Sequence, residues 1–228
     1  MNKDLPPGWE EASLFDFCRP KQWPTIATKM LSGTGYPVYG ANGVIGHHHE
    51  YNHEHATILI TCRGATCGTI NVCKPKSWIN GNAMALDDLR SDVVDFRYAV
   101  HALRNRGFAD VITGTAQPQI TRAGLEPVRI ALAPLDEQRR IVHKIEGLMA
   151  RSRRAKEALE AIPPLLGGSE IGNLGRLNRA ILAKAFRGEL VPQDPNDEPA
   201  SLVLERIRAE RQASTTKKKR GRVRNTSK

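Results

Sequence analysis

Long apolar runs are absent from the sequence. No stretch approaches the roughly 20 apolar residues that a membrane-spanning helix requires. The first residues, MNKDLPPGWEE, are polar and contain prolines, so we expect no signal peptide there. Apolar residues still make up 40% of the 228-residue chain, which is enough for a core in one large domain, or in one domain with an extension.

Cysteine is scarce, and its spacing does not indicate a metal or redox site. The chain has four cysteines, and Cys62, Cys67 and Cys73 are separated by four and five residues rather than paired as CxxC. Each is more simply a small, reduced, apolar side chain in or near a strand. This usage favours a reducing compartment, and we expect a cytoplasmic protein.

Histidine is concentrated in one stretch. Five of the seven histidines lie in YGANGVIGHHHEYNHEH, at His47, His48, His49, His53 and His55. The HExxH arrangement, which places two histidines on one helical face, is missing. We therefore predict no metal site, and we expect a polar loop whose histidines face solvent or a partner.

Motifs that carry catalytic chemistry are also missing. There is no GxxxxGK[ST] phosphate loop, no GxSxG nucleophile elbow and no GxGxxG in a strand–turn–helix setting. The carboxylate pairs Asp87–Asp88 and Glu10–Glu11 have no partner pattern. The sequence predicts a protein that is not an enzyme.

Basic charge is present, but most of the excess lies at one end. The net charge is +10, and the eight basic residues from Arg211 onward have no acidic residue among them. Without them, 26 basic residues face 24 acidic ones, a net of +2. Such a run is usually disordered, so we predict a basic disordered tail over residues 211–228 that attracts phosphates without reading sequence.

The chain up to Pro134 has a mixed α and β pattern. β-Branched runs predict strands at residues 56–62 and 68–73, joined by a tight turn, and a third strand at 127–133. Apolar residues at steps of three and four predict a helix over 93–103. Turn residues and neutral polar side chains fill 114–127.

A long helical segment follows Pro134, with acidic residues in its first turn. Mostly apolar positions recur at alternating steps of four and three, which is a heptad seam: Ile141, Ile145, Leu148, Ser152, Ala155, Leu159, Ile162 and Leu166. The prolines at 163 and 164 and four glycines between 167 and 175 predict a break, followed by a second helix and a short third one. The seam fits either a paired coiled-coil arm or a helix packed on its own domain.

Several segments together resemble one known family. They include YPVYGANGVIG, ATILITCRGATCGTIN, GTAQPQITRAGLEPVRIALAPLDEQRRIV and ILAKAFRGELVPQDP. The chain resembles the DNA specificity subunit of type I restriction–modification systems, in a half-length form. The resemblance implies an α/β target recognition domain followed by a long helical coiled-coil spacer arm. The implied boundaries are 1–134 for the domain and 135–210 for the spacer, with its break near 163–175.

The resemblance also implies which residues contact DNA. Base reading requires directed polar groups, such as arginine on guanine and asparagine or glutamine on adenine. The candidates for base contacts are Arg63, Thr66, Asn80, Asn82, Thr115, Gln117 and Gln119. The candidates for phosphate contacts, which position a domain without specifying sequence, are Lys74, Lys76 and Arg122.

Partners follow from the same resemblance. We expect double-stranded DNA, a methyltransferase subunit, a restriction and translocase subunit, and a second copy of this chain or another half specificity subunit. The seam is about 38 Å long at 1.5 Å per residue, close to the roughly 34–36 Å between half-sites one DNA turn apart. No cofactor is expected in this chain, because S-adenosylmethionine, ATP and Mg²⁺ belong to the partner subunits. A coiled-coil assembly protein that does not bind DNA is the alternative from another class.

Overall fold

A computed structural model describes residues 5–41, 43–160 and 170–224, and the side chains of these except 159–160, 170–174 and 214–224. The strands are β1 (Glu10–Ser13), β2 (Arg19–Gln22), β3 (Tyr36–Gly40), β4 (Gly43–His48), β5 (Ile58–Thr61), β6 (Ile70–Val72), β7 (Trp78–Ile79), β8 (Ala83–Asp87) and β9 (Arg129–Leu132). The helices are α1 (Leu14–Phe17), α2 (Phe96–Arg106), α3 (Leu135–Glu160), α4 (Glu170–Ala185) and α5 (Ala200–Arg224).

In this described part, the strands form three small sheets. Their strand orders are β2-β8-β5-β6, β4-β3-β7 and β1-β9. The predicted hairpin is confirmed, because β5 and β6 pair antiparallel with Ile60 opposite Ile70. Strand β1 pairs with β9, so the start of the chain closes against the end of the α/β region. The mixed α/β prediction is therefore confirmed.

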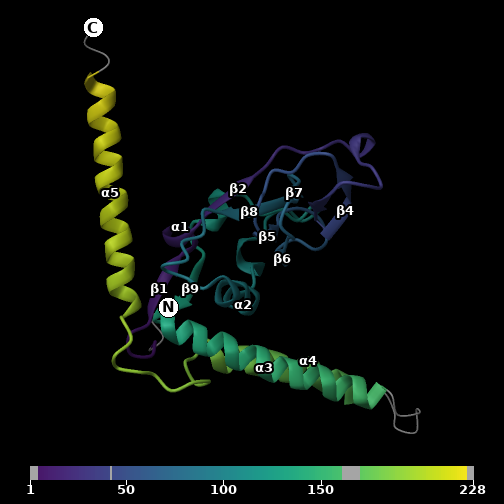
Figure 1. The fold of residues 1–228 in the computed structure, drawn as a ribbon, viewed down its shortest axis with the longest axis vertical. Coiled ribbons are helices and arrows are strands. Elements are labelled where there is room, and N and C mark those ends of the chain that lie inside the picture. Colours follow the sequence, from purple (N-terminus) through teal and green to yellow (C-terminus); the bar gives the residue numbers. More distant parts are fainter. Residues whose placement is uncertain (1–4, 42, 161–169, 225–228) are drawn as a thin grey trace.

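The four-stranded sheet is buried on both faces. Ile58 and Ile60 of β5 join a large apolar cluster that includes Tyr98 of α2. The intervening Leu59 points to the opposite face and joins a second cluster with Tyr39 of β3. This alternation places α2 on one face and the β3–β4–β7 sheet on the other (Figure 1).

The start of α3 is joined to the α/β region by buried polar side chains. The Trp9 indole donates to Glu137 Oε2 at 3.1 Å, and Glu137 has no exposed surface. Gln138 is equally buried, and its amide donates to the carbonyls of Val93 and Ala133 and accepts from the Asp95 amide. The PLDEQ segment therefore locks the direction in which α3 leaves the domain.

The first part of the seam is buried within the protein itself. Ile141 and Ile145 have no exposed surface and belong to the same apolar cluster as Tyr98. The prediction that these two isoleucines lie at a partner interface is wrong, because the adjacent domain already covers them. Leu159, Ile162 and Leu166 lie outside the described side chains.

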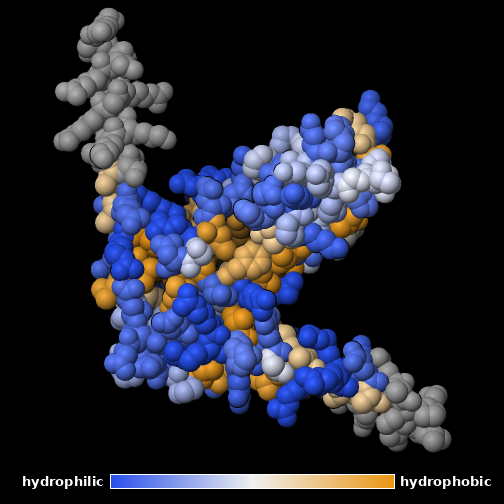
Figure 2. All heavy atoms as spheres, in the orientation of Figure 1, coloured by the Kyte–Doolittle hydropathy of each residue, from blue (hydrophilic) through white to orange (hydrophobic). Residues whose placement is uncertain are grey.

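Beyond Ile145, the seam faces α4, which lies beside α3 (Figure 1). The two helices border a groove of about 760 Å³, with Leu148, Ser152 and Ala155 on one side and Leu177 and Ile181 on the other. Ser152 is buried, whereas Leu177 remains 47% exposed. Figure 2 shows apolar side chains gathered in the angle between this pair and the sheets.

Helix α5 begins on the body of the protein and then leaves it (Figure 1). Val203, Leu204 and Ile207 are buried, and the Arg211 guanidinium donates to the carbonyls of Phe15 and Asp16. The predicted disordered tail differs from the structure, in which α5 continues to Arg224. The reason is that lysine, arginine, alanine and glutamine favour helix and no proline interrupts them. Among the described residues, no helix is long and apolar enough to cross a membrane.

Candidate nucleic-acid interface

The turn after β5 lies directly against the 113–119 loop. Arg63 forms an isolated antiparallel bridge with Gln119, and the Gly64 amide donates to the Pro118 carbonyl at 3.0 Å. The Ile120 amide donates to the Cys62 carbonyl at the same distance. Two segments that were predicted separately as base-reading loops therefore form one surface.

Two further loops join this surface. The Ala41 carbonyl, in the β3–β4 turn, accepts hydrogen bonds from the hydroxyls of Thr61 (2.9 Å) and Thr66 (3.3 Å). The Asn82 carbonyl accepts from the Cys62 amide at 3.0 Å. We call the combined surface the polar loop cluster and define it as Ala41, residues 63–67, Asn82 and residues 113–119.

The 113–119 loop is held in a narrow shape by its own backbone. Thr113 and Gln119 exchange both amide–carbonyl hydrogen bonds, at 2.8 and 2.9 Å. Gly114 has a φ of +83°, and a Cβ on it would lie 2.5 Å from the Gln117 carbonyl oxygen. Only glycine fits there. The side chains of Thr115, Gln117 and Gln119 are exposed, as a reading loop requires.

Arg63 supplies the positive charge of the cluster. Its side chain is exposed, and it makes no ion pair with any residue in the described ranges. Burial raises the pKa of the neighbouring Cys62 thiol, while a hydrogen bond from Gln22 and the charge of Arg63 oppose that shift. The cluster therefore presents a free guanidinium beside a thiol that stays protonated near neutral pH.

Asn80 is not placed to read a base. It is 3% exposed, and its side-chain oxygen accepts hydrogen bonds from the amides of Ile26 (3.1 Å) and Gly81 (2.9 Å). We correct its predicted role to a structural one, because these two bonds hold the 24–26 segment against β7. Its neighbour Asn82 is half-buried within the cluster.

The three predicted phosphate contacts lie apart from one another. Lys74 and Lys76 are exposed, but at the opposite end of the β5–β6 hairpin from Arg63. The Lys76 ammonium lies 3.9 Å from a carboxylate oxygen of Glu54. The Arg122 guanidinium donates to the Pro20 carbonyl at 3.2 Å and lies over the Phe15 ring at 4.9 Å. Arg122 is nevertheless exposed, and its phosphate contact stays a prediction.

The histidine stretch is not the predicted exposed loop. His47 and His48 lie on β4, and both His48 and His53 are buried. The two ring nitrogens of His53 lie 2.6 Å from Asn52 Oδ1 and 3.0 Å from Asp87 Oδ1, and its ring contacts Trp23 edge-on. His53 therefore binds the 52–55 segment to the end of β8. Of the five histidines, His49 and His55 are exposed.

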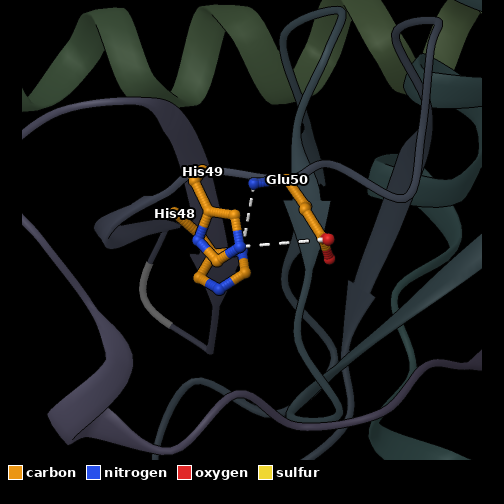
Figure 3. A group of neighbouring side chains, drawn as sticks. All are labelled: His48, His49 and Glu50. Carbon is orange, nitrogen blue, oxygen red and sulfur yellow. Dashed lines mark hydrogen bonds and ion pairs between the residues drawn. The ribbon is translucent and has the colours of Figure 1, made fainter.

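Three consecutive side chains in this stretch bring together groups that a metal ion can use (Figure 3). One ligand atom each from His48, His49 and Glu50 lies within 4.8 Å of the others. However, His48 Nδ1 accepts a hydrogen bond from the Glu50 amide, and tetrahedral zinc with bonds of about 2.0–2.1 Å needs ligands closer together. The prediction of no metal site stays a prediction.

Two apolar residues next to the cluster were not predicted from the sequence. Val44 and Ile45 of β4 are 49% and 43% exposed, close to the turn that carries Ala41. The sequence feature that could have indicated them is the pair of apolar residues between the two glycines of GVIG. Their exposure depends on strand pairing, which the sequence pattern does not reveal.

Comparison with known proteins identifies the family. The model described as type I restriction modification DNA specificity domain matches residues 6–162, more than half of the chain. The chain belongs to this family, and the predicted resemblance is confirmed. The EcoDI specificity subunit of Escherichia coli is 33% identical over 112 residues, covering 46% of this chain and 23% of that protein. The EcoKI specificity subunit of Escherichia coli strain K12 is 29% identical over 139 residues, covering 58% and 28%.

Solved structures agree with this assignment. The HsdS subunit from Thermoanaerobacter tengcongensis is 27% identical with a TM-score of 0.54, covering 83% of this chain and 47% of that one. The S subunit from M. genitalium, at 17% identity and a TM-score of 0.57, shares the fold over 70% of this chain and 43% of its own. The chain thus spans under half of these solved chains and about a quarter of the two curated relatives. These relatives are specificity subunits, so the prediction of a non-catalytic subunit is confirmed.

Proposed function

We propose that this chain recognises one half of a split DNA site and directs an adenine methyltransferase to it. The observation that carries the proposal is the joining of separately predicted reading loops into one polar loop cluster. Arginine reads guanine through two donors, and glutamine or asparagine reads adenine through a donor and an acceptor. Arg63, Gln117, Gln119 and Asn82 bring these groups to one surface of the domain formed by residues 1–134.

Phosphate contacts would hold the domain in place. Lys74 and Lys76 follow β6, about six strand residues or roughly 20 Å from Arg63. They would bind phosphates of the DNA backbone, away from the bases that the polar loop cluster reads. The basic residues from Arg211 onward would add attraction that does not depend on sequence.

The α3–α4 pair would serve as the spacer arm, within residues 135–210. At 26 residues, α3 is about 39 Å long, close to the distance between half-sites one DNA turn apart. Ile141 and Ile145 anchor it to the domain, which leaves the groove beside Leu148 and Leu177 for a partner helix. We propose that the arm of a second copy fills this groove, so that the paired chains recognise an inverted repeat.

Pairing with a different half-subunit, which would give an asymmetric target, is the second candidate. A coiled-coil assembly protein that does not bind DNA is less well supported, because such a protein has no use for an exposed cluster of arginine, glutamine and asparagine. In either pairing, this chain would assemble with the methyltransferase and restriction subunits. It would hold no cofactor of its own, and the partners would supply S-adenosylmethionine, ATP and Mg²⁺.

DNA binding by the complex with its methyltransferase tests the proposal. Arg63→Ala and Gln119→Ala should each reduce the preference for the target over a scrambled duplex by about 1–3 kcal/mol. Arg122→Ala provides a matched control, because a phosphate contact positions the domain without specifying sequence and its loss should not change the preference. Unchanged discrimination in both cluster variants would contradict the proposal.

A further inference from the structure

The tip of the β3–β4 hairpin carries two adjacent exposed apolar side chains, Val44 and Ile45. A single exposed apolar residue needs no explanation. These two, however, are neighbours on a strand that leads directly into the polar loop cluster. Ala41, at the hairpin turn, is fixed to that cluster by the hydroxyls of Thr61 and Thr66.

A β-bulge lies at the pair. Val44 is paired with Tyr39 and Gly46 with Val38, so Ile45 is the extra residue of the bulge. Residues directly opposite one another on paired strands normally share a face. Tyr39 is nevertheless only 7% exposed, whereas Val44 is 49% exposed. Val44 lies on the edge strand of this sheet, next to the turn, and is exposed although its partner Tyr39 is buried.

The backbone beneath Ile45 holds it in this position. A Cβ on Gly40 would lie 3.0 Å from Cγ2 and 3.1 Å from Cδ1 of Ile45, so the isoleucine lies across a glycine that leaves room for it. Valine and isoleucine are also stiff at χ1. The pair is thus a preformed apolar surface that loses little conformational freedom when a ligand covers it.

We propose that Val44 and Ile45 read a thymine in the target through its C5 methyl group. This inference rests on the proposed DNA-reading function of the polar loop cluster. The thymine methyl is the apolar group that base edges present in the major groove, where arginine and glutamine read guanine and adenine. An apolar pair on the strand that follows the Ala41 turn, which is hydrogen-bonded to Thr61 and Thr66, adds the recognition element that the polar residues lack.

The experiment removes the thymine methyl group from the DNA and, separately, the apolar side chains of Val44 and Ile45 from the protein. The complex of this chain with its methyltransferase is bound to target duplexes in which each thymine in turn is replaced by deoxyuridine. The native chain should lose about fourfold in affinity at one thymine, which corresponds to roughly 0.8 kcal/mol for one buried carbon group. In the Val44→Ser, Ile45→Ser double variant, which leaves no methyl group on either side chain, the same replacement should cost nothing further. Leu202→Ser, at a remote position that is 50% exposed, should behave as the native chain.

Other outcomes overturn the inference. If no deoxyuridine replacement weakens the native chain, or if native and variant chains lose equally, Val44 and Ile45 do not read a methyl group. Loss of methyltransferase binding by the variant in the absence of DNA would show that the pair docks protein instead. If the native complex does not prefer its target over a scrambled duplex, the proposed function fails, and this inference fails with it. A native chain that loses no affinity at any thymine overturns the inference even if the variant folds poorly.

Discussion

In the candidate site, some polar residues are buried and stabilise the fold, whereas others face outward. Asn80 and Asn82 are two residues apart, and the sequence offers no reason to separate them. The structure separates them by burial and hydrogen bonding. The Asn80 side-chain oxygen is buried and accepts from two backbone amides, whereas Asn82 is half-buried and joins the polar loop cluster through its backbone carbonyl. The two positions should therefore respond differently to the same substitution.

Asn80→Ala should lower the free energy of unfolding by about 1–3 kcal/mol, because it leaves the amides of Ile26 and Gly81 without their partner. Asn82→Ala should leave stability nearly unchanged and reduce target discrimination instead. Thermal unfolding and DNA binding of both variants check this. Equal stability losses in the two variants would contradict the assignment.

Glu137 should make stability depend on pH. Burial raises the pKa of its carboxyl, while the Trp9 indole and Arg140 oppose the shift. Below about pH 4.3, the ordinary pKa of glutamate, both the folded and unfolded states are protonated and the burial carries no ionisation penalty. As the pH rises through the higher folded pKa, the unfolded state ionises more readily, so this contribution to stability is lost.

The native chain should become less stable as the pH rises from about 4 to 7, and Glu137→Gln should abolish this pH dependence. The amide oxygen of the substituted side chain would still accept the hydrogen bond from the Trp9 indole. The measurement is the melting temperature of both proteins across this range. Parallel pH profiles would show that Glu137 is not the cause.

At the scale of secondary structure, the seam has two parts. Its first part packs into the core of the domain, and its second part borders the groove proposed for a partner helix. Ile145→Ala should destabilise the protein by about 2–5 kcal/mol, because a fully buried side chain is lost. Leu177→Asp should leave the melting temperature unchanged and convert the paired species to a monomer, as measured by light scattering. Leu202→Asp, at similar exposure on α5, is the control and should keep the paired mass. If the Leu177 variant keeps the mass of the paired species, the interface between the two copies lies elsewhere.

The basic end of α5 should act through charge alone. Truncation after Gln212 removes seven positive charges and retains Arg211, which contacts the body of the protein. Affinity should fall by a similar factor for every DNA sequence, and its dependence on salt concentration should become shallower. Titrations at several salt concentrations measure both effects. A changed target preference would assign the tail a reading role.

The sequence pattern predicts those helices and strands that depend mainly on neighbouring residues. The β5–β6 hairpin, α2, β9 and the start of α3 follow from β-branched runs, helical spacing and an acidic first turn. The pairing of β1 with β9 and the parallel pairing of β3 with β7 bring distant residues together, and no periodicity signals them. The same holds for burial, because a heptad seam has the same spacing whether a partner or its own domain covers it. For this reason Ile141 and Ile145 were placed at the wrong surface.

The candidate site was predictable as a set of residue types but not as a surface. Arginine, glutamine and asparagine in turn-rich segments indicate the loops that we propose to read DNA. The hydrogen bonds that join residues 63–67 to 113–119 depend on the fold, as does the burial that gives Asn80 a structural role. The histidine run was misleading, because a polar run of this kind does not show that β4 passes through it and buries His48.

At the scale of the whole molecule, the polar loop cluster and the α3–α4 pair belong to one continuous unit. The apolar cluster that contains β5 and α2 also contains the first turns of α3, parts of α4 and the start of α5. The buried Gln138 fixes α3 to the segment just before α2 through two hydrogen bonds, from the Asp95 amide and to the Val93 carbonyl. A rigid joint of this kind is what a protein needs to hold two DNA-reading surfaces at a set distance.

The central claim is that this chain decides which DNA sequence is methylated. Methylation-sensitive sequencing of the native genome, with the gene deleted and then restored, tests it most directly. We expect a split, inverted-repeat motif that disappears on deletion, returns with the native chain, and is lost or altered when the restored chain carries Arg63→Ala and Gln119→Ala. A motif that survives deletion, or that is identical with native and doubly substituted chains, would contradict the account.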